Sequence, residues 1–208
     1  MSRPSNGLEL AGKHRAIVED NDDPIKLGRL KVRIQAAYGA QPLEKLPWAW
    51  PCLPYGGMPQ TGLFAIPDIG SGVWVEFLWK DGRPDTTYPV WTGTWLAEDE
   101  TPIEAIGPKD PVPGDEKVVS KQVYRYKVFK TTAGHSITLC DLPGKESVTI
   151  EHGTKGAIIH MDKEGNISIC GPKKIAIDAG EELLLRAPHI RQERDEGSAG
   201  RYDDVDRS

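Results

Sequence analysis

The sequence has few cysteines and no long apolar run. Its 208 residues include three cysteines, Cys52, Cys140 and Cys170, with no CxxC or CxxH spacing. This predicts free thiols rather than a disulfide framework or a zinc site. No stretch approaches the ~18 apolar residues of a membrane span, and the opening MSRPSNGLELAGKHR holds no apolar segment of signal-peptide length. We therefore expect a soluble protein made in the cytoplasm, whose export would need another route.

An excess of basic charge is also absent. The chain carries 26 basic and 31 acidic residues, a net charge of −5. Binding bare phosphate backbone requires a basic surface, so we expect no nucleic-acid partner. The segment DIGSG starts like a dinucleotide fingerprint, but Val75 stands where the third glycine belongs, and GxxxxGK[ST] is missing. These glycines predict a hairpin turn, and we expect no cofactor.

Clear catalytic or metal-binding patterns are lacking as well. Histidines and cysteines are both present, but nothing flanks the cysteines as in a protease family, and Cys140 and Cys170 lie inside strand patterns. The acidic run DNDD at 20–23 offers at most a weak cation site and favours a solvated turn. The sequence therefore predicts no catalytic residue, no metal and no enzymatic activity.

The first half of the chain contains short, alternating β-rich segments. Residues 13–20 and 28–35 are separated by NDDPIKLG, which is typical of a turn or bulge. A proline-broken stretch, LPWAWPCLPYGGMP, follows, and then come GLFAIP, VWVEFLW and YPVWTGTW, with turns at DIGSG and KDGRPD. Five or six short strands without helical periodicity favour a small closed barrel. We predict an OB-type barrel domain over residues 1–97, with the strands from about residue 10.

The second half is built differently. Residues 98–123 carry four prolines and many charges, the composition of a linker. A ladder of short strands follows over residues 124–190, as YRYKVFKT, HSITLCD, ESVTIEH, GAIIHMD, GNISICG, KKIAIDA and EELLLRA. The step between strands shrinks from eleven residues to eight. Residues 191–208 form a polar C-terminal tail.

Each of these strands places two apolar side chains on one face, because residues two apart in a strand share a face. If one chain stacks strands of about five residues into a ladder, the apolar face remains exposed to solvent. The linker and the tail are too polar to cover it. Three copies wound about one axis would bury it, so we predict an intertwined triple-stranded β-helix, a trimeric β-prism. A one-chain solenoid is the weaker alternative, because eight residues are too few for a three-sided coil. The predicted trimer core is Ile137, Leu139, Val148, Ile150, Ile167, Ile169, Ile175, Ile177, Leu183 and Leu185.

Two histidines lie near the predicted inward positions of this prism. His152 is two residues after Ile150 and would share the strand face of Val148 and Ile150, so a trimer would allow three imidazoles to converge on its axis. The position at the strand end nevertheless favours a histidine that faces solvent. His160 has no clear phase, because GAIIHM is apolar on both faces.

These segments resemble a known family. AIVEDNDDPIKLGRLKVRI, PWAWPCLPYGG and GLFAIPDIGSGVWVEFLWKDGRPDTTYPVWTGTW are similar to the OB-fold domain of phage baseplate hub and spike proteins. KTTAGHSITLCDLPGKESVTIEHGTKGAIIHMDKEGNISI is similar to the strand register that follows it. The family includes the T-even gene-product-five spike and the VgrG proteins of type VI secretion. The likeness covers roughly residues 13–188.

The resemblance implies a homotrimeric central spike of a contractile tail baseplate. Its implied partners are hub and tail-tube proteins, a PAAR-like tip protein and, transiently, the target cell envelope. The lysozyme domain of the T-even spike has no counterpart, since only the linker occupies its place, so muramidase activity is not implied. Some spikes hold an axial metal with a His-x-His pair, but only His189 lies near this end, and we expect no iron.

Six tryptophans lie between Trp48 and Trp95. OB barrels use such rings to stack bases or sugars, but without a basic groove we interpret them as barrel core and as trimer or hub contacts. The alternatives that stay open are a spike with a cell-wall-degrading site and an OB-type nucleic-acid or glycan binder.

Overall fold

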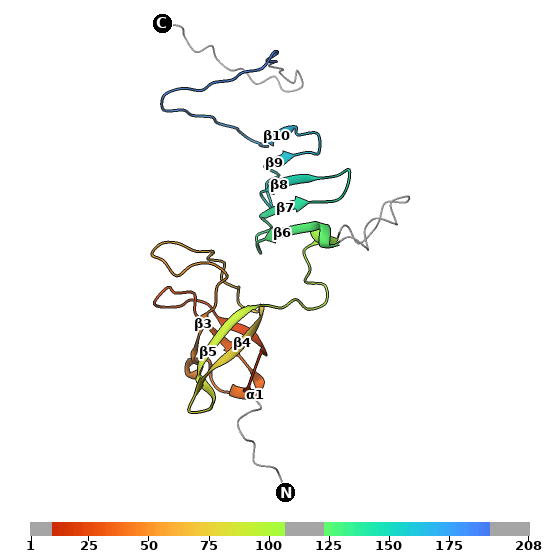
Figure 1. Cartoon of the computed structure of the whole chain (residues 1–208). Helices are drawn as coiled ribbons and strands as arrows, with labels where there is room; N and C mark the ends of the chain where they lie inside the picture. Colours follow the sequence, from red (N-terminus) through yellow and green to blue (C-terminus); the bar gives the residue numbers. More distant parts are fainter. Residues whose placement is uncertain (1–9, 107–122, 192–208) are drawn as a thin grey trace.

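The structure, a computed structural model, describes residues 10–106 and 123–191. The predicted tail, apart from residue 191, and most of the predicted linker lie outside these residues. The described chain forms a closed barrel and a separate antiparallel ladder, both built from strands (Figure 1). The all-β class and the N-terminal barrel are therefore confirmed.

Five strands close the barrel in the order β1-β2-β3-β5-β4. They are β1 (His14–Asp20), β2 (Leu30–Arg33), β3 (Trp48–Pro51), β4 (Gly72–Lys80) and β5 (Arg83–Thr94), with α1 (Gln35–Tyr38) and η2 (Leu43–Lys45) between β2 and β3. Only β3 and β5 pair in parallel, and this pairing closes the barrel. Asp81 and Gly82 both have positive φ, 51° and 78°, as a two-residue hairpin between β4 and β5 requires.

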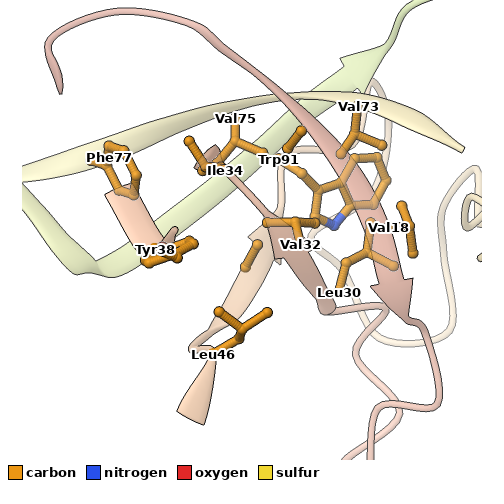
Figure 2. Packing of buried hydrophobic residues seen from close by; sticks show 12 residues of the cluster. Val18, Leu30, Val32, Ile34, Tyr38, Leu46, Val73, Val75, Phe77 and Trp91 are labelled. Carbon is orange, nitrogen blue, oxygen red and sulfur yellow. The ribbon is translucent and has the colours of Figure 1, made fainter. Parts of the chain in front are cut away.

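Alternate residues of the barrel strands fill one apolar core (Figure 2). Leu30, Val32, Val73 and Val75 are completely buried. Trp91 brings its indole into this core, and its Nε1–H donates to the carbonyl of Gly28 at 3.1 Å, so the buried polar atom is satisfied. The full set of core residues is Ala16, Val18, Leu30, Val32, Ile34, Tyr38, Leu46, Ala49, Val73, Val75, Phe77 and Trp91.

The turn between β1 and β2 is organised by a buried carboxylate. Asp23 is 2% exposed and accepts hydrogen bonds from the backbone N–H groups of Ile25, Leu27 and Arg29. The Arg29 guanidinium also pairs with it, at 2.7 Å. This bonding to Arg29 lowers the pKa of Asp23 well below its usual range, although burial opposes the shift. The prediction of a solvated turn at 20–23 is wrong for Asp23, whose oxygens bind the chain itself.

Two predicted features of the barrel differ from the structure. The proline-broken stretch contains β3, because Leu30 and Lys31 of β2 pair with Ala49 and Trp48, not with the prolines. The segment GLFAIP, at 62–67, forms no strand. In a closed barrel every strand already has two neighbours, so this segment has no free edge to join.

The ladder is a five-stranded antiparallel sheet in which each strand pairs with the next along the chain. Its strands are β6 (Tyr126–Lys130), β7 (Ser136–Cys140), β8 (Ser147–Glu151), β9 (Ile158–Met161) and β10 (Ile167–Cys170), and η3 (Val123–Arg125) precedes β6. Figure 1 shows them stacked in sequence order. The short helix α2 (Ile103–Ile106) lies within the segment predicted as a linker and contacts β6.

After β10 the described chain forms no strand. Residues 171–191 include the predicted strands KKIAIDA and EELLLRA, but neither is paired here. One chain thus builds five rungs, and the prediction of two further rungs is not met within a single chain.

Candidate functional site

One face of the ladder is almost entirely apolar. The register places Ile137 opposite Ile150, and Ile150 opposite Ile159, so these side chains lie in one column on one face. A second column runs through Leu139 and Val148. We call this the apolar face; its residues are Phe129, Ile137, Leu139, Val148, Ile150, Ile159, Met161, Ile167 and Ile169.

The apolar face is open to solvent. Apart from half-buried Val148, its residues are 37–63% exposed. A groove of about 630 Å³ runs along it, lined among others by Ile137, Ile150, Ile169 and Ile175. Soluble monomers rarely expose so continuous an apolar patch, which normally marks an interaction surface.

The opposite face of the ladder is buried at β7 and becomes exposed toward β10. Ser136 and Cys140 are 5% and 6% exposed. Burial, and then the interaction with Cys140, raise the pKa of Tyr126. Lys130 donates to Glu104 of α2. The two faces therefore differ: the chain covers part of the opposite face near β6 and β7, whereas the apolar face is exposed along the ladder.

The predicted core residues divide into two groups. The first six, from Ile137 to Ile169, share the apolar face. The other four, Ile175, Ile177, Leu183 and Leu185, lie in the unpaired segment and are 52–67% exposed. That all ten form a trimer core stays a prediction.

Three residues of the apolar face were missed from the sequence: Phe129, Ile159 and Met161. For the last two the signal was ambiguous, because GAIIHM is apolar at consecutive positions. Only the pairing of Ile159 with Ile150 resolves which face it takes.

Of the two histidines considered for the prism axis, His152 lies at the border of the apolar face, where it lines the groove with Ile137 and Ile150, and His160 does not lie on that face. His152 follows β8 at the edge of the ladder, and its ring packs edge-on against His135, with 4.3 Å between centroids. His160 lies on the opposite face, where its Nδ1 is 2.9 Å from the hydroxyl of Thr149. These contacts give both side chains local structural roles.

The six tryptophans are mostly outside the barrel core. Trp91 alone among them is fully buried. Trp48 and Trp50 lie under the guanidinium of Arg29, at 5.4 and 5.5 Å. Trp79 is 57% exposed on the β4–β5 hairpin. The interpretation as barrel core therefore holds for one ring, and the others are available on the surface.

The described ranges contain no group of side chains that could hold a metal ion. Within residues 10–106 and 123–191, no three His, Cys, Asp or Glu side chains are placed to hold a metal ion. The cysteines are free thiols, exposed at Cys52 and Cys170 and buried at Cys140. None of the described helices is long and apolar enough to cross a membrane.

One known protein family matches the barrel. Residues 14–96, from the first residue of β1 to just beyond β5, match the family model of the type VI secretion system/phage-baseplate injector OB domain. The barrel is therefore similar to the OB domain of this family. The match ends before α2 and does not extend to the ladder. A search of curated proteins found no match.

Over the barrel, this match confirms the resemblance inferred from the sequence. It supports a structural role in a baseplate or type VI secretion spike and association with baseplate or tail components. In this chain the OB-type barrel precedes a ladder with an exposed apolar face, so this face is the candidate functional site.

Proposed function

We propose that the protein is the central spike of a contractile tail baseplate or related injection particle. In this proposal it acts as a homotrimer that joins the hub and tube to the tip and pierces the target envelope. The single observation that carries the proposal is the apolar face of the ladder, exposed along five successive strands behind an injector OB domain.

The apolar face supplies a reason for three chains to associate. The residues of this face, with Ile175, Ile177, Leu183 and Leu185, are on average about half exposed. Completing the burial of one such side chain is worth ~1 kcal/mol, so a dozen give roughly 12 kcal/mol per chain. Each association step costs about 4–15 kcal/mol of lost freedom. Three chains sharing one core thus gain enough to associate stably.

The unpaired segment 171–191 fits the same proposal. Its apolar pairs repeat every eight residues, and β10 leaves one backbone edge unpaired at the top of the ladder. Neighbouring chains would supply strand partners for this segment and an apolar axis for its inward pairs. The proposed structure is the intertwined β-helix expected from the sequence.

The proposed work is mechanical and assigns no catalytic residue, metal or cofactor. A hydrogen-bonded three-chain prism resists bending because a bend would break contacts in all three chains together. Sheath contraction would supply the force, and the particle would hold the protein at the tail baseplate.

Sedimentation equilibrium at micromolar concentration tests the proposal directly. A trimer has a mass of about 69 kDa, three times the 22.9 kDa of one chain. Negative-stain images should show a rod continuing from a threefold collar. A folded species of 22.9 kDa, with no rod, would refute the spike.

A further inference from the structure

An arginine on the outer surface of the barrel is held between two tryptophans. Arg15 of β1 lies directly opposite Trp74 of β4 in the sheet register. Its guanidinium is 5.7 Å from the centroid of the Trp74 ring and 5.1 Å from that of Trp95. Both distances are within cation–π range.

The two rings are themselves fixed. The Trp95 Nε1–H donates to the carbonyl of Val73 at 3.2 Å. Its ring also lies so close to Gly72 that a Cβ there would come within 2.5 Å. Gly72 therefore makes room for the Trp95 ring, and the site is pre-organised rather than a chance contact of mobile side chains.

Arg15 has no anionic partner among the described residues, unlike its neighbours in the barrel. Arg29 pairs with Asp23 and Arg33 with Glu19, at 2.7 and 2.6 Å. Lys13, two residues before Arg15 on the same face, is neutralised by Glu76 at 2.6 Å. The exposed Arg15 guanidinium thus keeps its N–H donors available.

We propose that this clamp, Arg15 with Trp74 and Trp95, is a docking point for a partner protein that presents one carboxylate beside apolar residues. A planar guanidinium matches a carboxylate in a two-point hydrogen bond, and stacking on two indoles reduces the entropy lost on binding. Exposed Ile17 and Leu96, 38% and 60% exposed, lie beside the clamp in sequence and supply apolar contact. Arginine and tryptophan are also the residues enriched at the energetic centres of interfaces.

The charge pattern favours a protein carboxylate over a polyanion. A nucleic acid or sulfated glycan needs several unpaired cations, whereas here Glu76 neutralises Lys13 and leaves Arg15 alone. The inference concerns the barrel surface and does not depend on the proposed trimer of the ladder.

Selection from a random dodecapeptide library on the immobilised full-length protein tests this. We expect enriched peptides with Asp or Glu next to apolar residues. By fluorescence anisotropy, a selected peptide should bind R15Q about tenfold more weakly than wild type, and its Gln counterpart should lose a similar factor on wild type. R15K, which keeps the charge but not the planar fork, should fall between the two.

R83Q is the matched control, because Arg83 is an exposed barrel arginine for which the described structure shows no ring contact. It should bind like wild type, and every variant should keep a cooperative thermal transition above the temperature of the binding assay. The proposal is overturned if selection yields no peptides, if they carry no acidic residue, if R15Q binds them equally, or if dextran sulfate alone binds at this site. A change in trimer mass would bear on the spike and not on this clamp.

Discussion

A single substitution on β10 distinguishes the two faces of the ladder. Ile169 lies on the apolar face and is 57% exposed in one chain, while the preceding Ser168 points to the opposite face and is exposed. Ile169→Asp and Ser168→Asp place the same carboxylate one residue apart on the same strand. Their intrinsic cost to the strand is therefore similar. Only the first should prevent trimer formation.

The expected effect of Ile169→Asp is large. Completing the burial of Ile169 is worth about 1–1.5 kcal/mol per chain, or ~4 kcal/mol in a trimer. Enclosing three carboxylates near one axis adds a penalty of several kcal/mol for each. The total exceeds ~10 kcal/mol, a substantial part of what the whole apolar face offers. Ser168→Asp should cost less than about 1 kcal/mol, because the carboxylate stays in water.

Analytical ultracentrifugation and native mass spectrometry give the result. Wild type and Ser168→Asp should sediment at about 69 kDa, three times 22.9 kDa, and Ile169→Asp as single chains. The barrel has its own core, so its thermal transition and tryptophan fluorescence should be the same in all three. A trimer that survives Ile169→Asp, or equal dissociation by both variants, would show that the apolar face is not the contact.

Three predictions concern the barrel. Asp23→Asn should lower the free energy of unfolding by about 3 kcal/mol, because it leaves the buried Arg29 charge uncompensated. Folding lowers the pKa of Asp23, so its contribution to the free energy of unfolding is complete above the usual pKa of an aspartate and is lost as the pH falls below about 4. In thermal melts, acid should therefore destabilise wild type more than Asp23→Asn. Gly72→Ala should displace the Trp95 ring, shift its fluorescence and cost about 1–3 kcal/mol. Leu30→Ala, at a fully buried position, should cost about 3 kcal/mol in urea unfolding, and a loss below ~1 kcal/mol would contradict the assigned core.

Alternating patterns predicted the strands well wherever one face meets a core or a regular neighbour. Residues 13–20, 28–35 and 73–79 contain β1, β2 and most of β4, and the repeats from residue 124 contain β6 to β10. The failures arise where pairing, not local pattern, decides. Trp48 and Ala49 form a strand despite flanking prolines because β2 is beside them, and the apolar run 62–67 forms none because the barrel has no edge left.

The burial and contacts of individual side chains were the second feature that the sequence did not predict. No local signal distinguishes buried Asp23 from Asp22 beside it, since the difference is made by the turn that brings Arg29 back onto it. Nor does sequence separate Trp91, inside the core, from Trp95, outside it on Gly72. Such positions depend on which strands become neighbours, and that is a property of the closed barrel as a whole.

The contrast between the two parts of the ladder connects these limits to function. From β6 to β10 the chain has turns between rungs and satisfies its backbone by pairing with itself, leaving only side chains uncovered. Beyond residue 170 the eight-residue step continues, but the backbone forms no strand within the described chain, and the apolar side chains are exposed. A polypeptide gains nothing alone from such a segment, because extended apolar strands in water are unfavourable. The end of strand pairing after β10 therefore marks where the proposed trimer changes from three side-by-side ribbons to strands that exist only when three chains meet.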